Sequence, residues 1–459
     1  MASKNLPIGY LPDETPSPVE LFFFALQQIV VMFPATVLVA LITGFHVSTT
    51  IFASGLATLC FILVTGRKIP LYYGSSFSYI AAISSIMTQE AIAANGLNTM
   101  ISTAQFGIVM SGLVSIAAGF IIKFSGRKAI DKVLPPTVTG SIAMIIGLSL
   151  AANAMGNSAV IPSVEEAKEA LATNMAWTIA LITLISTIAY SVYLKGKLSQ
   201  LPILFGLLTG YVAALIIGAA TGVPFVSFNN AGLTDKFFNL PEFTLPKPSW
   251  AAIAAIMPIA IATIPESTAH VYQLDIYVND LAKKKGSSKK YNIADKLGLN
   301  LIGDGIGDII SGFIGGPAGT NYGENISTMA ISKVFSTIVL IVAAIITMII
   351  ACFTPLINVV YSIPTAVIGG LSIYLFGVIG AQGITIMLDR KVDMFSSKNL
   401  AVIATILVVG LGGSYGFEGG MIPAFGTQFP ALATAAVVGI ALNLILSIGD
   451  KDTASVSNE

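Results

Sequence analysis

Long apolar runs recur along the whole chain and are separated by short polar loops. A membrane-spanning helix needs about 20 predominantly apolar residues, and its backbone polar groups must be paired within the segment. Two stretches, Ile69–Met87 and Gly312–Ile326, are apolar but interrupted. Together with the continuous runs they predict an all-α polytopic membrane protein with about fourteen transmembrane segments. The continuous runs start near Leu21, Thr49, Ile101, Leu134, Met175, Leu201, Trp250, Asn292, Ser327, Pro364, Leu400 and Gln428.

The composition excludes several classes of protein. Of the 459 residues 55% are hydrophobic and only 10% are charged, with a mean hydropathy of +0.85. Soluble proteins carry about 25% charged residues, so this chain cannot cover a soluble surface. A disordered chain and a nucleic-acid binder are excluded for the same reason. Because acidic and basic residues balance at 23 each, the net charge indicates no charged partner.

The positions of the basic residues predict the orientation. If the amino terminus is cytoplasmic and each segment reverses the side, all but three of the 23 basic residues fall inside. The three outside are Lys168, Lys236 and Lys247. Basic loops stay in the cytoplasm, so we expect an even number of segments in the cell membrane with both termini cytoplasmic.

The long loop around Thr221–Pro248 divides the chain into two halves of about seven segments each. An odd number of segments per half makes the second half enter from the opposite side, which is the condition for an inverted repeat. We expect a first repeat at 1–222, an extracellular linker at 223–250, a second repeat at 251–450 and a cytoplasmic tail at 451–459.

The interrupted stretches each contain a run that does not suit a helix. Tyr72–Tyr79 is rich in aromatic residues, Ser and Gly, and Gly315–Asn325 contains four glycines and a proline. Such runs could be ordinary loops outside the membrane. Irregular backbone at membrane depth survives only where it lines a cavity or is buried in protein, and in matching places of two halves it is typical of a transporter's binding site.

Ionisable residues at depth favour the binding-site interpretation. Glu266 lies inside an apolar run, and His270 follows one helical turn later on the same face. A carboxylate in hydrocarbon costs at least about 2.5 kcal/mol, so Glu266 must face a polar interior, where it can exchange a proton. Alternatively, the Glu266 carboxyl could only hydrogen-bond to the backbone of a neighbouring helix, and His270 could be an ordinary core histidine. Asp304 is a candidate for the same proton network, whereas Asp308 is expected nearer a segment end, where it could simply be solvated.

The sequence offers little for catalysis or metal binding. The two histidines, His46 and His270, form no zinc-binding pattern, and no nucleophile elbow or phosphate-binding glycine loop is present. We therefore expect neither an enzyme, a metal site nor an organic cofactor, and the proton is the expected coupling ion.

A specific resemblance emerges at the second interrupted stretch. The run Tyr322–Ile326, preceded by Pro317 and Thr320–Asn321, resembles the signature of the nucleobase–ascorbate (nucleobase:cation symporter) transporter family, and in particular its uracil permease branch. Further matches are Gly74–Phe77, Phe33–Val39, Ile310–Phe313, and Glu266 with its histidine four residues on. The resemblance implies fourteen segments in two inverted repeats of seven, a core and a gate domain, and short antiparallel strands in segments 3 and 10. It also implies a homodimer.

The resemblance also implies roles for individual residues. The substrate would be bound by the Glu266 and Glu324 carboxylates, the Phe77 ring, and the backbone of Phe77 and Gly323, with Ala35 lining the pocket. His270 and Asp304 would belong to the proton network, together with Gln28. The chain departs from the family at Gln27–Gln28, Ser267, Ala269, Ser327 and Ser332, so the polar network and the choice among nucleobases could differ.

These features predict a proton-coupled symporter that imports uracil by alternating access. Carboxylates can accept hydrogen bonds from a uracil ring's N–H groups, half-helix amides can donate to its carbonyls, and an aromatic ring can pack on its face. A proton-coupled xanthine or urate permease is the alternative. A sodium-coupled carrier and an anion carrier of related fold are further alternatives.

Overall fold

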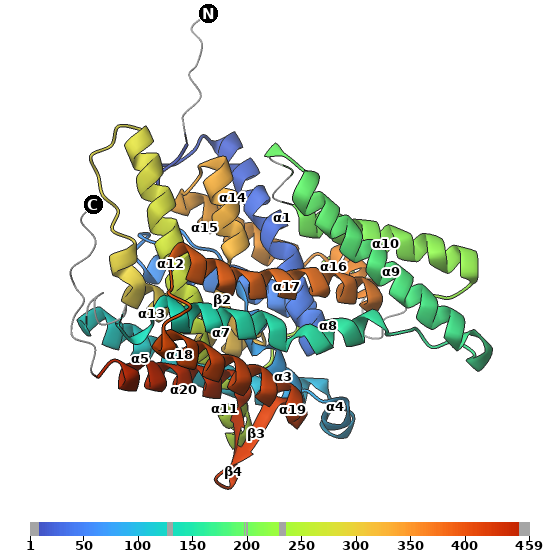
Figure 1. The fold of residues 1–459 in the computed structure, drawn as a ribbon. Helices are drawn as coiled ribbons and strands as arrows, with labels where there is room; N and C mark the ends of the chain where they lie inside the picture. The colour runs from blue at the N-terminus through green and yellow to red at the C-terminus, as the bar shows by residue number, and fades with distance from the viewer. Residues whose placement is uncertain (1–8, 126–131, 197, 199–200, 229–235, 449–459) are drawn as a thin grey trace, which may run out of the picture.

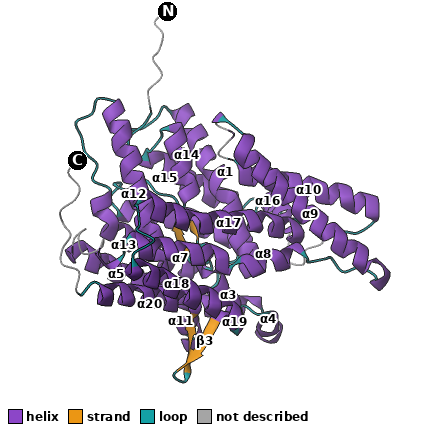
Figure 2. Ribbon diagram, viewed as in Figure 1, coloured by secondary structure: helices purple, strands orange, loops and turns teal. Residues whose placement is uncertain are grey.

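The computed structural model describes residues 9–125, 132–196, 198, 201–228 and 236–448, and almost all of them lie in helices or short connections (Figure 2). The predicted tail at 451–459 and part of the predicted linker, 229–235, lie outside the described residues. Up to residue 228 the elements are α1 (Pro18–Thr43), α2 (Val47–Val64), β1 (Tyr73–Ser75), η1 (Phe77–Tyr79), α3 (Ile80–Ile86), α4 (Gln89–Asn95), α5 (Leu97–Ser125), α7 (Pro136–Ser149), α8 (Ala151–Ser158), α9 (Glu166–Tyr193) and α10 (Pro202–Thr221).

After the long connection a second series of elements follows. These are α11 (Trp250–Ile256), α12 (Ile259–Lys284), η3 (Ala294–Lys296), α13 (Leu297–Ile314), β2 (Gly319–Asn321), α14 (Gly323–Ser332), α15 (Thr337–Ile350), α16 (Thr354–Tyr361), α17 (Thr365–Asp389), α18 (Ser397–Leu407), η4 (Val408–Gly412), α19 (Gly413–Gly416), η5 (Glu418–Gly420), β3 (Met421–Ala424), β4 (Thr427–Pro430) and α20 (Ala431–Leu446).

Many of these helices have the length and apolarity of membrane-spanning segments. Within the described residues, ten helices are long and apolar enough to cross a bilayer, and three shorter apolar ones are Phe77–Ile86, Thr337–Ile350 and Ala431–Leu446. Their exposed surfaces carry large apolar side chains, for example Ile185 and Val192 on α9. The prediction of a multi-pass helical membrane protein is therefore confirmed at this level.

The two stretches with irregular sequence pair with each other. Strands β1 and β2 run antiparallel, with Tyr73 opposite Asn321, Gly74 opposite Thr320, and Ser75 opposite Gly319. Both strands are completely buried. Because the glycines and Pro317 disfavour helix, the backbone here is extended, and pairing satisfies the amides that a helix would have satisfied internally.

Close helix packing surrounds the paired strands. Helices α5 and α13 approach through facing glycines, since a Cβ at Gly112 would come 2.5 Å from the Gly305 carbonyl, and one at Gly305 would come 2.3 Å from the Gly112 carbonyl. Gly140 of α7 and Gly383 of α17 face each other in the same way. Small residues let helix backbones approach closely, which is the usual packing device in membranes. Helices α9 and α10 pack side by side at one edge of the molecule (Figure 1).

An antiparallel hairpin protrudes at one end of the bundle (Figure 1). It is formed by β3 and β4, which the sequence pattern did not predict, and it carries the fully exposed Phe425 at its turn. Phe425 and Gly426 both have positive φ, as a tight hairpin turn requires. Strand β4 contacts α11, the short helix that precedes α12, so the hairpin lies at that end of the bundle (Figure 1).

Candidate functional site

Two short helices begin directly after the paired strands. Strand β1 leads through Ser76 into η1 and α3, which start at Phe77, and β2 leads through Tyr322 into α14, which starts at Gly323. The first amides of a helix have no partner within it, and the positive end of the helix dipole lies there. Both helix starts therefore present N–H donors in the interior of the molecule, next to the strand pair.

Helix α12 passes both helix starts. The Ser78 hydroxyl lies 3.4 Å from the Glu266 Oε2 atom and donates to it. One turn further along, His270 lies against the start of α14, since a Cβ at Gly323 would be 3.0 Å from the His270 Nε2 atom. Four helical residues span about 6 Å, so the two helix starts meet α12 about one turn apart.

Both acidic residues lie where α12 meets the two helix starts. Glu266 meets the first helix start through Ser78, and Glu324 is in the first turn of α14, directly after Gly323. Glu266, Glu324, Phe77 and Gly323 are each partly exposed, although the neighbouring strand residues are buried. The two carboxyl groups, the Phe77 ring and the start of α14 are therefore accessible to a ligand or to water.

His270 connects α12 to the strand pair. Its ring hydrogen-bonds to the backbone of Asn321, the last residue of β2. The other ring nitrogen, Nδ1, is buried and has no hydrogen-bond partner within the described protein. His270 thus holds the end of β2 at the level of Gly323, beside the two carboxyl groups.

Asp304 accepts three hydrogen bonds behind the strands. Its Oδ2 atom accepts from the Ser267 hydroxyl and from the Asn300 side-chain amide, both at 2.9 Å. Its Oδ1 atom accepts from the Asn321 side-chain amide at 2.7 Å. Asp304 therefore links α12, α13 and β2 in one buried network, and its partner on α12, Ser267, directly follows Glu266.

Gln28 and Ala35 both lie on α1. The Asn325 side-chain amide donates to the Gln28 backbone carbonyl at 3.0 Å and to its side-chain carbonyl at 2.8 Å. Ala35 is buried beside Thr36, whose hydroxyl lies 2.9 Å from the Tyr322 hydroxyl. Gln28 therefore contacts the first turn of α14 directly, whereas the structure shows for Ala35 only that it is buried on the same helix.

The structure corrects the expectation for Asp308. This residue is only 2% exposed and lies inside α13 rather than at its end, so it is not simply solvated. Its Oδ1 atom accepts a hydrogen bond from the Tyr73 hydroxyl at 2.5 Å and another from the Gly319 amide at 2.8 Å. Because those partners come from the two strands, and the nearer of them is 11 residues away, no local pattern indicated the contact.

The sequence also missed an aromatic residue on α17. The Phe376 ring lies 5.8 Å from the Phe77 ring, centroid to centroid, in an edge-to-face arrangement at 75°. Phe376 is buried and comes from a glycine-rich helix without any irregularity that would have singled it out. It brings α17 into contact with the site.

Several polar atoms around the site have no protein partner. Among the described residues, seven buried side-chain atoms lack a hydrogen bond, and four of these belong to His270, Thr320, Asn321 and Asn325. Leaving such an atom unpaired costs about 1–3 kcal/mol of free energy. These atoms are therefore available to hydrogen-bond to a polar ligand or to ordered water. No cluster of three or more potential metal ligands occurs among the described residues.

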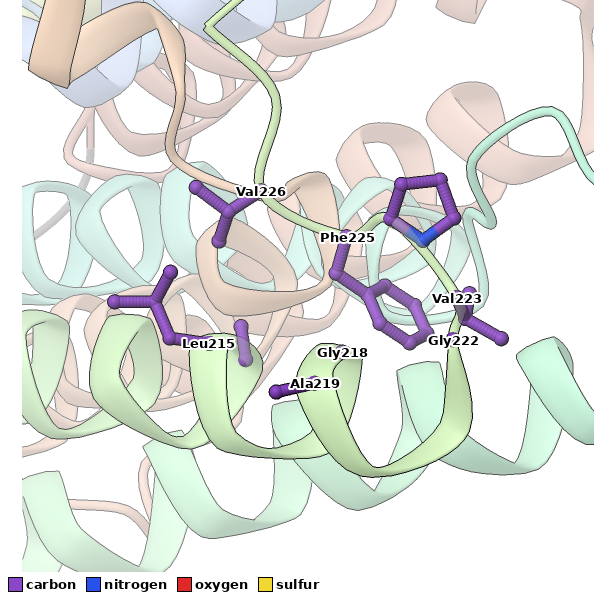
Figure 3. Close-up of a pocket in the computed structure, with 9 residues that line it drawn as sticks. Leu215, Gly218, Ala219, Gly222, Val223, Phe225 and Val226 are labelled. Atoms are coloured by element: carbon purple, nitrogen blue, oxygen red, sulfur yellow. The ribbon is translucent and has the colours of Figure 1, made fainter.

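An apolar hollow lies elsewhere on the molecule (Figure 3). It has a volume of about 340 Å³ and is bordered by the end of α10 and the loop that follows, from Ala214 to Val226. Its lining side chains are all apolar, so they offer a polar heterocycle no hydrogen-bonding side chain. The paired strands and their helix starts are therefore the better candidate site.

Comparisons with known proteins agree with these features. Residues 19–419 match the profile of the xanthine/uracil permeases (Xan_ur_permease, described as "Permease family"). The uracil permease of Bacillus caldolyticus is 35% identical over 449 residues, covering 96% of this chain and 95% of the relative. The uracil permease of Bacillus subtilis is 33% identical over 466 residues, covering 100% and 99%. A putative pyrimidine permease of Escherichia coli, RutG, is 31% identical over 441 residues, covering 95% and 91%.

Solved structures of similar fold come from more distant proteins. The anion-transporter relative SLC26A9 superposes with a TM-score of 0.64 at 12% identity; the match covers 94% of this chain but only 65% of that one. The transmembrane domain of the cyanobacterial bicarbonate transporter BicA gives a TM-score of 0.57 at 14% identity, covering 94% and 97%. At these identities the likeness concerns the fold alone. The profile match and the full-length relatives show that the chain belongs to the xanthine/uracil permease family, also called the nucleobase–ascorbate transporter family, and is a membrane transporter.

Proposed function

We propose that the protein is a proton-coupled symporter that carries uracil across the cell membrane by alternating access. The observation that carries this proposal is that α12 places Glu266 at one helix start and His270 at the other, one turn apart. Full-length relatives named uracil permease support the choice of substrate. The chemistry of the site supports it independently.

The site complements the edge of a pyrimidine ring. Uracil alternates N–H donors with carbonyl acceptors around its ring. The Glu266 and Glu324 carboxylates would accept from the N–H groups, and the amides at Phe77 and Gly323 would donate to the carbonyls. The Phe77 ring would pack on the face of the base, with Ala35 beside it. Such a site binds through several short, directional contacts, which favours a small planar heterocycle over a flexible solute.

Glu266 is the proposed proton carrier. With Glu324 at the start of α14 the site would hold two carboxyl groups, and two like charges close together favour uptake of a proton by one of them. A protonated Glu266 would still accept from a ring N–H through its carbonyl oxygen, and loss of the proton on the other side of the membrane would restore the repulsion between the two carboxylates and weaken binding. His270, Asp304 and Gln28 would hold the surrounding polar network in position.

The finer architecture is part of the proposal. Fourteen segments follow if the strand-and-helix units β1–α3 and β2–α14 each count as one segment, α7–α8, α11–α12 and α18–α19 count as single crossings, and the short helices α4 and α16 are not counted. The two strand units then occupy matching places in the inverted repeats 1–222 and 251–450. A core carrying the site would move against a gate that includes α9, α10 and α17. We also propose that both termini are cytoplasmic, that the linker at 223–250 is extracellular, and that the protein is a homodimer.

The alternatives are less well supported. A purine permease for xanthine or urate would use the same scaffold, but the full-length relatives described above are named as uracil or pyrimidine permeases. An anion carrier would need a basic group, and the described ion pairs of Lys284, Lys285 and Lys289 lie at the end of α12 and just beyond it, at least 18 residues along the chain from Glu266. A sodium-coupled carrier is separated from a proton-coupled one by the test below.

Transport in proteoliposomes tests the proposal. With an inward proton gradient, labelled uracil should accumulate, and Glu266→Gln should abolish accumulation. Glu418→Gln, which removes an exposed carboxyl remote from the site, is the matched control and should leave uptake unchanged. Uptake of xanthine but not uracil would move the assignment to the purine alternative. Uptake that requires sodium and persists after the pH gradient is collapsed would remove the proton claim.

A further inference from the structure

The transport chemistry proposed above leaves one buried carboxyl without a role. Asp308 lies on α13, one turn beyond Asp304 on the same helix face. It does not share Asp304's hydrogen-bond partners. Its two described contacts go to β1 and to β2, the strands that precede the two helix starts.

A single oxygen atom of Asp308 holds both strands. Its Oδ1 atom accepts from the hydroxyl of Tyr73, the first residue of β1, and from the amide of Gly319, the first residue of β2. Tyr73 and Gly319 lie at opposite ends of the antiparallel register, since Tyr73 pairs with Asn321 and Ser75 with Gly319. The Tyr73 side chain therefore reaches across the strand pair to meet Asp308 at the far strand's beginning.

The Tyr73 ring is tightly packed where it crosses the strand pair. A Cβ at Gly319 would come 2.4 Å from the Tyr73 ring, and one at Gly307 of α13 would come 2.6 Å from it. The Tyr73 backbone is held as well, because its amide donates to the Thr58 hydroxyl and its carbonyl accepts from Ser54 and Thr58. The Tyr73 ring is thus enclosed between β2 and α13, and its hydroxyl has one described partner, Asp308.

The other strand carries a similar but uncharged contact. The Tyr322 ring covers Gly74, where a Cβ would come 2.4 Å from it, and the Tyr322 hydroxyl bonds to Thr36 and to the Ser75 carbonyl. The Tyr73 ring thus covers Gly319 of β2, and the ring of Tyr322, which follows β2, covers Gly74 of β1. Of these two tyrosine hydroxyls, only that of Tyr73 is held by a carboxyl group among the contacts of the described residues.

We propose that Asp308 is a positioning residue for the substrate site, acting through Tyr73 and Gly319. It sets how β1 and β2 lie against each other, and so where the amides of Phe77 and Gly323 and the carboxyl of Glu324 point. Gly319 is four residues from Gly323, and the intervening backbone is paired and buried. A shift of β2 is therefore transmitted to the start of α14.

This inference rests on the proposed function, because its readout is the affinity for uracil. Tyr73→Phe removes the hydroxyl and keeps the ring, and should raise the KM and the Kd for uracil about three- to tenfold, with the maximal rate changed less than twofold. Asp308→Ala should raise them further. Asp308→Asn retains an oxygen that can accept from both donors, so it should restore affinity to within about threefold of wild type.

The matched control is Tyr79→Phe. Tyr79 is a fully buried tyrosine in the same segment, and its hydroxyl lies 2.5 Å from the Ser111 hydroxyl, away from the strands. Its loss should alter expression or thermal stability without raising the KM. A rise in KM no larger for Tyr73→Phe than for Tyr79→Phe would overturn the proposal. So would a shifted pH profile in Asp308→Asn, because Asp308 would then be a proton carrier.

A second measurement separates this proposal from the proposed function. Hydrogen–deuterium exchange of peptides covering residues 316–326 should be faster in Tyr73→Phe than in wild type and Tyr79→Phe, whatever the substrate. If the wild type neither binds nor transports uracil, the proposed function fails, and the exchange data still decide whether Asp308 holds the strands. Unchanged exchange in Tyr73→Phe would overturn the positioning role.

Discussion

The Phe77 ring packs edge-to-face on the Phe376 ring, with the centroids 5.8 Å apart. The two rings come from α17 and from the helix that follows β1, so the contact joins elements about 300 residues apart in the chain. Phe77 is partly exposed to the site, whereas Phe376 is buried behind it. The orientation of the Phe77 ring, and so the surface offered to a planar ligand, depends on α17.

Replacing Phe376 should therefore weaken substrate binding without abolishing transport. Aromatic pairs of this geometry contribute about 0.5–1.5 kcal/mol, so Phe376→Ala should raise the KM for uracil about two- to tenfold. Phe376→Tyr keeps the ring and is the matched control. Competition by a panel of nucleobases against labelled uracil measures the effect, which should include weaker discrimination among bases. An unchanged KM with a lower maximal rate would show instead that Phe376 serves only the packing of α17.

Removing the carboxyl of Asp304 should destabilise the protein. Asp304→Ala leaves the Ser267 hydroxyl and the amides of Asn300 and Asn321 without their acceptor, at about 1–3 kcal/mol for each buried donor. Asp304→Asn keeps one acceptor oxygen and should be milder. The melting temperature in detergent should fall most for Asp304→Ala and hardly at all for Asp280→Ala, because the Asp280–Lys284 pair is exposed. Equal melting temperatures for Asp304→Ala and Asp280→Ala would contradict this account of the network.

The crossing of the strands should not tolerate a side chain at Gly74. A Cβ there would come 2.4 Å from the Tyr322 ring, which is buried and held at its hydroxyl, so the ring has no room to move aside. Gly74→Ala should abolish uracil binding or prevent folding. Gly377→Ala on α17 is the control, because nothing lies within 4 Å of a Cβ at that position. Wild-type binding by a correctly folded Gly74→Ala protein, checked by size-exclusion profile and equilibrium binding, would refute the close approach.

Gln28 and Asn325 should behave as a coupled pair. Their side chains are joined at 2.8 Å between α1 and α14, and Asn325 follows Glu324 directly. Gln28→Ala, Asn325→Ala and the double variant form a cycle in which contacting residues typically show about 0.5–3 kcal/mol of interaction. The double variant should therefore lose less uptake than the product of the two single losses. Strict additivity would mean that Asn325 acts on the substrate independently of α1.

Much of the architecture could be predicted from local pattern. Length and apolarity of individual runs indicated a multi-pass helical protein, because each spanning helix must satisfy its own backbone within one continuous segment. Glycine and proline at 315–325 indicated a break for an equally local reason, and the structure has extended backbone there. Glu266 and His270 could be placed on one helix face from their spacing alone.

The partners of those residues could not be predicted in this way. Asp308 was expected near a segment end, where it could be solvated, yet it is buried against Tyr73, 235 residues earlier in the chain. Phe376 gave no signal, since an aromatic residue in an apolar helix is ordinary. The hairpin at 421–430 was missed because its strands are short and follow a glycine-rich loop.

The amino-acid sequence by itself determined that this protein is a membrane protein. It also determined at which residues the helical pattern is interrupted and which acidic groups lie among apolar residues. Each of these follows from the free energy of placing a short segment in hydrocarbon, which depends on that segment alone. Only the tertiary structure decided that the two broken segments pair, that α12 passes both helix starts, and that Asp308 joins the strands. Those contacts depend on how helices distant in the chain pack together, and packing is a property of the whole bundle.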